Sequence, residues 1–358
     1  MVRKVSPLAA AAACGHKLGQ NRIWGSAHMH TIGVVGAGAW GTALAATARR
    51  AGRQVVLWAH EPEVAAAIAA TGENARYLPG VALDAGVRPT ADLGEAAAAD
   101  AVLLVTPAQH LRAICTRLAS AWRPGTAAVV CAKGIEVATG ALMAEVVAQA
   151  LPTAPVAVLS GPTFAIEVAR GLPAAVTLAC ADAALGASLV EAIGTPTFRP
   201  YLSDDLVGAQ VGGAVKNVLA IGCGIVEGRS LGDNARAALI TRGLAELMRF
   251  AIAKGGKAET LMGLSGLGDL ILTAASSQSR NYSLGLALGG GRSLAEVLAG
   301  RHSVTEGVWT AGVVVREAAS LGIEMPICAA VDAILNHGAA VDDAVNALLA
   351  RPFRTEGI

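Results

Sequence analysis

The sequence predicts an α/β domain built on a parallel sheet, followed by a domain made only of helices. Short β-rich runs alternate with Ala-rich helical segments as far as about residue 202, and only helical patterns continue from there to Ile358. The first β-rich run also leads into a glycine-rich turn that opens a helix. We therefore expect an extension at 1–29, the α/β domain at 30–202 and the helical domain at 203–358.

The composition narrows the classes of protein to consider. A chain of 358 residues is ample for two domains, and 54% of the residues are hydrophobic. The net charge of +1 gives no electrostatic argument for binding nucleic acid or an anionic membrane. The six cysteines form no C-x-x-C pair or Cys/His cluster. We expect a reduced, cytoplasmic protein without a metal site.

The first 29 residues stand outside this pattern. Their basic start and short Ala-rich run resemble a signal peptide, but the run is weak and breaks at Gly15, His16 and Lys17. No disulfide-rich secreted domain follows. We expect a disordered extension, with Met29 as the natural beginning of the fold.

The glycine-rich turn GAGAWG (36–41) predicts a dinucleotide site. A strand at 31–35 enters the turn, and an Ala-rich helix at 42–50 leaves it. In such a motif Gly36 permits the tight turn, Gly38 lets a pyrophosphate approach the backbone, and Gly41 lets the helix pack on the strand. The helix N-terminus then offers N–H groups and a positive dipole end to the phosphates.

The end of the second strand, at 54–58, bears on the choice of dinucleotide. An NAD-specific site normally has an Asp or Glu there for the ribose 2′-hydroxyl. Here the strand runs into His60, and Glu61 comes just after it. We expect NADP to be favoured over NAD, because a 2′-phosphate would be tolerated by His60 and by three arginines nearby in sequence: Arg49, Arg50 and Arg53.

Five further β-rich runs complete the predicted sheet, at 101–105, 127–131, 156–159, 175–179 and 197–201, with helices between them at 93–99, 110–121 and 142–151. Ligands of such sheets bind at the carboxyl ends of the strands. Lys133 follows one of these ends, where it is either an ordinary solvated lysine or a partner for a phosphate or carbonyl group. SGPT (160–163) follows another, as a plain turn and N-cap or as an anion site.

The helical half opens with a nearly uncharged helix at 206–226 whose single ionisable residue is Lys216. A buried ammonium either loses its proton or is paired, and a lysine with a movable pKa suits proton transfer. We expect Gly212 and Gly213, one turn earlier, to leave room for something to approach the lysine, which the resemblance described below identifies as substrate and nicotinamide. The alternatives are a lysine that snorkels from a core helix and a membrane span. The span is disfavoured because no other segment is a credible one.

Further helices are predicted at 235–254, 257–262, 270–276, 282–288, 294–299, 306–321, 328–336 and 341–349, with a break at 263–268. Directly after the break, Asp269 places a carboxylate in apolar surroundings, where a cationic partner or a substrate hydroxyl would stabilise it. QSRN (278–281) offers guanidinium, amide and hydroxyl donors ahead of a helix, which suits a phosphate. Each stretch alone is equally consistent with a polar loop.

Taken together, these motifs carry a family resemblance that covers about residues 30 to 350. In order and spacing the chain resembles the bacterial NAD(P)-dependent glycerol-3-phosphate dehydrogenases at GAGAWGTALA (36–45), NARYLPG (74–80), CAKGIE (131–136), SGPTFA (160–165), GGAVKNVLAIG (212–222), NARAALITRGLAE (234–246), GLGDLILT (266–273) and QSRN (278–281). The resemblance implies a Rossmann domain with a mostly parallel, doubly wound sheet and an all-α domain of the 6-phosphogluconate dehydrogenase type. It also implies reversible reduction of dihydroxyacetone phosphate to sn-glycerol 3-phosphate for glycerophospholipid synthesis.

Residue roles follow from the same resemblance, motif by motif. Lys216 matches the proton acceptor/donor, and Lys133 a lysine that touches both substrate and cofactor. The other implied substrate contacts are Gly161, Thr163, Asp269, Ser279, Arg280 (which also reaches the cofactor) and Asn281. The other implied cofactor contacts are Gly36, Gly38, Ala39, Trp40, Gly41, His60, Ala165, Val304 and Glu306. Ala39 departs from the family, which often has Ser there, so only its backbone N–H remains for a phosphate.

The expected mechanism is hydride addition to the C2 carbonyl carbon, with Lys216 protonating the oxygen and Lys133 polarising it. Asp269 either binds a substrate hydroxyl or holds Lys216. Two other functions stay open at this point: a β-hydroxyacid-type dehydrogenase with a carboxylate substrate, and a catalytically silent NAD(P)-binding sensor. QSRN favours a phosphate ester over a carboxylate, and the two lysines argue against a sensor. The small-residue-rich helical half suggests a homodimer.

Overall fold

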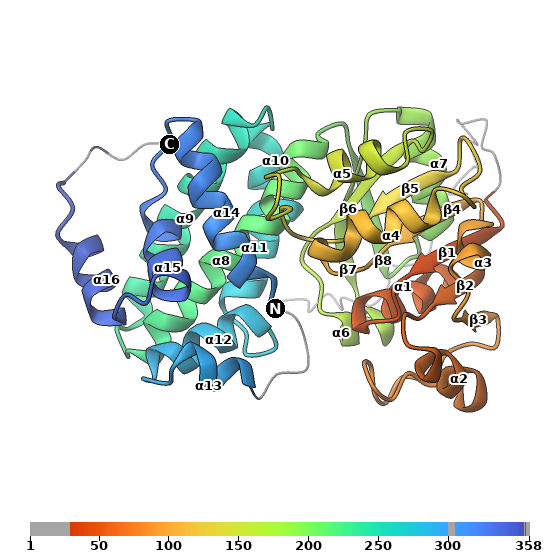
Figure 1. The fold of residues 1–358 in the computed structure, drawn as a ribbon, viewed down its shortest axis with the longest axis horizontal. Helices are drawn as coiled ribbons and strands as arrows, with labels where there is room; N and C mark the ends of the chain where they lie inside the picture. The colour runs from red at the N-terminus through yellow and green to blue at the C-terminus, as the bar shows by residue number, and fades with distance from the viewer. Residues whose placement is uncertain (1–28, 300–304, 354, 356–358) are drawn as a thin grey trace, which may run out of the picture.

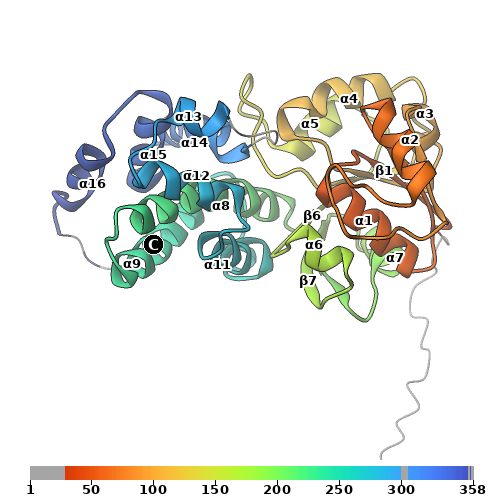
Figure 2. The same ribbon diagram turned by 90° about the horizontal axis from the view of Figure 1, so that it is seen from below.

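A computed structural model describes residues 29–299, 305–353 and 355, and it places an eight-stranded sheet with its helices beside a domain of helices only (Figure 1). The view from below separates the same two parts (Figure 2). The predicted fold class is therefore confirmed. The predicted extension lies outside the described residues, apart from Met29.

The sheet has the strand order β3-β2-β1-β4-β5-β6-β7-β8. Neighbouring strands are parallel except β6 and β7, which are antiparallel. The strands are β1 (Thr31–Val35), β2 (Gln54–Trp58), β3 (Val87–Thr90), β4 (Ala101–Leu104), β5 (Ala127–Val130), β6 (Val156–Ser160), β7 (Ala174–Cys180) and β8 (Phe198–Ser203).

Among the described strands, the antiparallel pair β6–β7 is the one departure from parallel order, in keeping with the mostly parallel sheet that the resemblance implies. Between β6 and β7 the only helix is α6 (Ala165–Ala169), which has five residues. Such a helix is about 7.5 Å long, whereas the five-residue β6 spans about 17 Å. Because α6 does not return the chain along the whole strand, β7 runs back in the opposite direction.

Helices cover both faces of the sheet. Alternate residues of one strand point to opposite faces, so Val34 joins one core cluster and Val35 another. The first cluster includes side chains of α1 (Ala39–Arg50), α2 (Pro62–Thr71), α6 and α7 (Ala183–Ile193). The second includes side chains of α3 (Leu93–Ala97), α4 (Leu111–Leu118), which follows the short turn η1 (Ala108–His110), and α5 (Met143–Ala150).

The helical domain is assembled around α8 (Leu206–Gly228), which is buried from Gly208 to Val226. Among the described residues it is the one helix long and apolar enough to cross a membrane, but its apolar window is wholly inside the protein. The other elements are α9 (Asp233–Ala253), α10 (Ala258–Met262), the π-helical turn η2 (Leu264–Gly268), α11 (Asp269–Ala274), α12 (Arg280–Gly289), α13 (Leu294–Ala299), α14 (Glu306–Ser320), α15 (Pro326–Asn336) and α16 (Val341–Leu349).

Glycines let α8 and α12 approach until their backbones touch. A methyl group on Gly224 would lie 2.1 Å from the Tyr282 carbonyl oxygen, and one on Gly285 would lie 1.9 Å from that of Ile221. Both distances are far inside van der Waals contact. The glycines in these helices therefore set the position of α12, whose N-terminus faces the candidate site.

Candidate functional site

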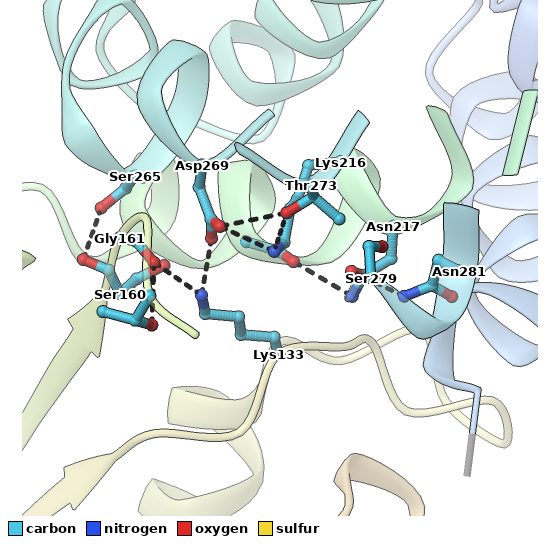
Figure 3. Close-up of polar contacts among 12 residues, drawn as sticks. Lys133, Ser160, Gly161, Lys216, Asn217, Ser265, Asp269, Thr273, Ser279 and Asn281 are labelled. Carbon is cyan, nitrogen blue, oxygen red and sulfur yellow. Dashed lines mark hydrogen bonds and ion pairs between the residues drawn. The ribbon is translucent and has the colours of Figure 1, made fainter. Parts of the chain in front are cut away.

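The candidate site lies where the carboxyl ends of β5 and β6 meet α8, η2 and α11. Figure 3 shows Lys133, which follows β5, reaching toward Asp269 at the start of α11, with Lys216 and Thr273 on the other side of that carboxylate. The structure thus brings together side chains of residues that are up to 140 positions apart in the sequence.

Asp269 holds the two lysines at once. Its carboxylate is fully buried, with 0% exposure. Lys216 Nζ donates to Oδ1 at 2.7 Å, and Lys133 Nζ donates to Oδ2 at 2.6 Å. Lys133 also donates to the Gly161 carbonyl oxygen at 2.9 Å. Of the two roles expected for Asp269, holding Lys216 is therefore the one that its geometry supports.

Lys216 is the more buried of the two lysines, with 9% of its side chain exposed. Burial lowers its pKa from 10.5 to about 8, while the negative charge of Asp269 opposes this shift and the positive charge of Lys133 adds to it. An amine with this pKa carries a proton at neutral pH and gives it up readily. The site therefore contains a group suited to proton transfer.

Sequence reasoning missed Thr273. Its hydroxyl accepts a hydrogen bond from Lys216 Nζ at 2.6 Å and donates to Asp269 Oδ1 at 3.3 Å. Thr273 lies one turn after Asp269 on α11, and the i, i+4 spacing of these two polar residues in the apolar run DLILT is the signal that could have indicated it.

Protein atoms lie directly against Gly212 and Gly213, which corrects the expectation that these two glycines leave space for substrate and nicotinamide. A methyl group on Gly212 would lie 2.3 Å from the Ser265 carbonyl oxygen, so this glycine admits the backbone of η2. A methyl group on Gly213 would lie 2.8 Å from Ser160 Oγ and 3.3 Å from Lys133 Cγ. The two glycines let η2 and Lys133 approach the lysine, and they do not open a cavity for a ligand.

The glycine-rich turn has the geometry that a dinucleotide needs. Gly36 has φ +122°, and a methyl group on it would lie 2.8 Å from the Val105 carbonyl oxygen. A methyl group on Gly41 would lie 1.8 Å from the Gly36 oxygen, which shows how closely helix and strand pack. At Gly38 no described atom lies within 4 Å of that position, so the N-terminus of α1 is open.

Four buried polar atoms that follow or end strands, or begin α14, have no hydrogen-bond partner among the described residues: Trp40 Nε1, Thr106 Oγ1, Ser160 Oγ and Glu306 Oε2. Trp40 follows β1, Thr106 follows β4 and Ser160 ends β6. Glu306 is the first residue of α14. Buried polar groups are normally satisfied. A nicotinamide dinucleotide with donors and acceptors along its length fits such a surface, and Ala39 adds a backbone N–H.

The three arginines that were expected to tolerate a 2′-phosphate bind other parts of the protein. Arg49 pairs with Asp84 at 2.8 Å, Arg50 donates to the Val168 and Ala169 carbonyl oxygens, and Arg53 donates to those of Glu191 and Ala192. They lie near the amino end of β2, whereas His60 follows its carboxyl end. Their closeness in sequence does not place them at the ribose, so this part of the prediction is wrong. His60, edge-on to Trp58, is the residue that remains there.

The N-terminus of α12 is the candidate phosphate site. Ser279 caps the helix by accepting from Tyr282 N at 3.2 Å, and the exposed Arg280 follows. The side chain of Asn281 is engaged within the protein: it donates to Asn217 Oδ1 at 3.0 Å and accepts from Gly307 N at 3.1 Å. Asn281 therefore has its main-chain N–H, on the first turn of the helix, to offer an anion.

The remaining predicted contacts lie on both sides of the site. Thr163 donates to the Gly161 oxygen at 3.3 Å, and Ala165 begins α6. Glu306 Oε1 accepts from Ala108 N at 3.0 Å, which joins the helical domain to the turn after β4. Val304 lies outside the described residues.

Comparison with known proteins gives a consistent match over the whole fold. The family model described as "NAD-dependent glycerol-3-phosphate dehydrogenase N-terminus" matches residues 31–186, and the one described as its "C-terminus" matches residues 205–346. A protein of Rhodospirillum rubrum named "Glycerol-3-phosphate dehydrogenase [NAD(P)+]" is 63% identical over 327 residues, which cover 91% of this chain and 94% of that protein.

Two further comparisons agree. A protein of Paramagnetospirillum magneticum with the same name is 71% identical over 255 residues, covering 71% of this chain and 93% of that protein. The crystal structure of glycerol-3-phosphate dehydrogenase from Coxiella burnetii superposes with a TM-score of 0.87 at 40% identity, covering 90% of this chain and all of that one.

Proposed function

The chain belongs to the NAD-dependent glycerol-3-phosphate dehydrogenases, and from this premise we propose how its residues carry out the reaction. The enzyme is an oxidoreductase that uses NAD or NADP to interconvert dihydroxyacetone phosphate and sn-glycerol 3-phosphate. The names of these relatives describe a glycerol-3-phosphate dehydrogenase, and not a β-hydroxyacid-type dehydrogenase or an NAD(P)-binding sensor. What the family name leaves open is which residue does what.

The observation that carries the proposal is the pair of lysines on one buried carboxylate. When bound, the reduced cofactor would supply a hydride to C2 of dihydroxyacetone phosphate, and negative charge would then develop on the C2 oxygen. Lys216 donates its proton to that oxygen, and in the reverse direction the neutral amine takes it back. The pKa of about 8 suits both directions near neutral pH.

Lys133 and Asp269 support this proton transfer. The ammonium of Lys133 polarises the carbonyl group and stabilises the developing charge, a role that its place beside Lys216 on the same carboxylate supports. Asp269 supplies one negative charge to two ammonium groups, and Thr273 accepts from Lys216 on the same side. Asp269 and Thr273 are therefore positioning residues that fix where the proton donor points.

The substrate phosphate binds at the N-terminus of α12. Backbone N–H groups there, the Ser279 hydroxyl and the Arg280 guanidinium are donors of the kind that hold phosphate. Gly161 and Thr163 complete the substrate site beside Lys133. Because the phosphate does not react, its binding energy orients the carbonyl carbon for hydride addition.

The residues that would hold the cofactor follow the carboxyl ends of the strands. Gly36, Gly38, Gly41 and the N–H of Ala39 would hold its pyrophosphate, with Trp40 beside them. His60, which follows the carboxyl end of β2, would contact the ribose, and it is the residue on which the proposed preference for NADP over NAD rests. Glu306 and Ala165 are further proposed contacts of the cofactor. Lys133 and Arg280 are proposed to contact both the cofactor and the substrate. Val304 belongs to the same proposed set.

We also propose the wider setting of the enzyme. The proposed domain division is 30–202 and 203–358, and it is supported by the last strand, which ends at Ser203, one residue past this boundary, and by α8, which begins at Leu206. The product supplies the backbone of glycerophospholipids. The five described cysteines are free and buried, in keeping with a cytoplasmic protein. Exposed apolar side chains such as Leu349 and Phe353 in the helical half support a homodimer.

Replacement of the proton donor tests the proposal. Lys216→Ala is expected to lower kcat for reduction of dihydroxyacetone phosphate about 100- to 10,000-fold, the range that a positioned acid contributes. Binding of NADPH, followed by fluorescence, and the melting temperature report whether cofactor site and fold survive. Lys257→Ala is the control, because this lysine pairs with Asp204 on the surface. Near-native turnover of Lys216→Ala with bound cofactor would rule out the assignment.

A further inference from the structure

The segment that carries Lys133 leaves the sheet and packs into the helical domain. In this segment, residues 133–142, Ile135 and Leu142 form an antiparallel bridge and lie in the core cluster of the helical domain. Arg316 of α14 donates to the Val137 carbonyl oxygen at 3.0 Å. The 133–142 segment therefore has one end on the sheet and its middle on the other domain (Figure 1).

A carboxylate within this segment is held from the sheet side. Glu136 is 7% exposed. Arg112 of α4 donates to it through Nε and Nη2, at 2.8 Å each, and the Thr139 hydroxyl donates at 2.5 Å. Arg112 lowers the pKa of the Glu136 carboxyl group. Two charge-assisted bonds in the planar fork geometry fix both position and orientation, which a single bond would not.

The neighbouring backbone is held by the same helical stretch. Gln109 Nε2 donates to the Ile135 carbonyl oxygen at 2.8 Å, and Gln109 Oε1 accepts from Val137 N at 2.9 Å. Gln109 and Arg112 thus bind the three consecutive residues 135–137. The two short helical elements that follow β4, η1 with Gln109 and α4 with Arg112, therefore fix the backbone just beyond Lys133.

This arrangement matters for Lys133 because its side chain is long and has many rotamers. Its ammonium reaches Asp269 and the Gly161 oxygen only if its backbone is placed correctly. A displacement of about 1 Å at a reacting group is enough to cost roughly 100-fold in rate. The side-chain hydrogen bonds of Glu136 join it to Arg112 and Thr139, so its effect on the chemistry is expected to pass through the backbone to Lys133.

We propose that Glu136 is a positioning residue, which together with Arg112 and Gln109 fixes the 133–142 segment so that Lys133 meets Asp269 and the substrate carbonyl. The inference rests on the function proposed above for Lys133. It differs from a merely structural role in one respect: the effect of Glu136 on turnover requires that Lys133 be present.

A double-mutant cycle measures that requirement. The variants are Glu136→Gln, Lys133→Ala and the combination, compared by kcat and KM for reduction of dihydroxyacetone phosphate at saturating NADPH. Glu136→Gln is expected to lower kcat roughly 10- to 100-fold in the native background. In the Lys133→Ala background the same change is expected to lower kcat less than twofold. Melting temperatures are recorded for each protein.

The control is Glu95→Gln, which removes an exposed Glu–Arg pair with Arg88 on the same domain and is expected to leave kcat unchanged. Gln109→Ala, taken through the same cycle, replaces Glu136→Gln if that variant does not fold. Equal losses in both backgrounds, or native kcat for Glu136→Gln, would overturn the inference. Native kcat for Lys133→Ala would instead refute the role of Lys133, so the two failures are distinguishable.

Discussion

Asp269 is the residue on which the protonation of Lys216 depends. It is buried and its two oxygens are bound by ammonium groups from different domains. Desolvation favours the neutral amine of Lys216, and Asp269 is the main group that favours the charged one. The balance leaves the pKa near 8, within reach of physiological pH, so a single carboxylate tunes the proton donor.

Removal of this charge should shift the titration of the donor. In Asp269→Asn the pKa of Lys216 is expected to fall below 8, because burial and the charge of Lys133 both lower it and their opponent is gone. The decline of kcat for ketone reduction should then begin at lower pH than in the native enzyme. Asp332→Asn, at a buried carboxylate on α15, is the control. A pH–rate profile that stays in place would contradict this role of Asp269.

At the scale of elements, α8 carries glycines whose roles differ although they are adjacent. Gly212 packs against the backbone of η2, which cannot easily move aside. Gly213 packs against the side chains of Ser160 and Lys133, which can change rotamer. Gly222 has ordinary van der Waals distances to its neighbours, 3.4 Å at the closest. One helix therefore offers three positions for the same substitution with three expected results.

Gly212→Ala is expected to destabilise the protein by about 1–3 kcal/mol, because the new methyl group overlaps a carbonyl oxygen. Gly213→Ala is expected to lower kcat by displacing Lys133, with a smaller loss of stability. Gly222→Ala should be neutral or stabilising, since Ala favours a helix. Urea unfolding and kcat of the three variants check this order. Native kcat in Gly213→Ala would show that Lys133 is not held against α8.

Sequence patterns predicted the elements whose signals are local. The turn at Gly36–Gly41 and the apolar run of α8 could be read from spacing alone. β3 was not predicted, because its short sequence VRPT contains a proline and lies at a sheet edge, where a strand has little apolar pattern. The boundaries of most helices shifted by one or two residues, as expected where caps decide them.

The candidate site was predictable in composition but not in its internal contacts. Motifs indicated Lys133, Lys216 and Asp269, yet the sharing of one carboxylate depends on how the domains meet. The error over Arg49, Arg50 and Arg53 has the same origin, since a strand carries residues that are close in sequence to opposite ends of a sheet. Thr273 and Glu136 act through other residues, and only the folded chain identifies their partners.

At the scale of the whole molecule, polar and apolar contacts join the two domains to each other. Lys133 meets Asp269, Ser265 Oγ donates to the Ser160 carbonyl oxygen at 3.3 Å, and Ala144 N donates to Gln210 Oε1 at 2.7 Å. The core of the helical domain contains Ile135 and Leu142, which belong to the α/β domain in sequence. Loss of one domain would therefore remove part of the other domain's core.

The protein is accordingly expected to unfold in one cooperative step. Scanning calorimetry should give a single transition, with a calorimetric enthalpy equal to the van't Hoff enthalpy. Glu95→Gln, on the surface, should leave the shape of the transition unchanged. Two separated transitions would mean that the contacts across the domain junction contribute little to stability.

The central claim, that Lys216 exchanges the proton, is tested most directly by the pH dependence of kcat/KM for dihydroxyacetone phosphate at saturating NADPH. The protonated amine is required for reduction, so kcat/KM should fall about tenfold per pH unit above a pKa of about 8. Oxidation of glycerol 3-phosphate requires the neutral amine, so its kcat/KM should rise as the pH approaches 8 and level off above it. A reduction profile that stays flat from pH 7 to about pH 10, the ordinary range of lysine, would contradict the claim.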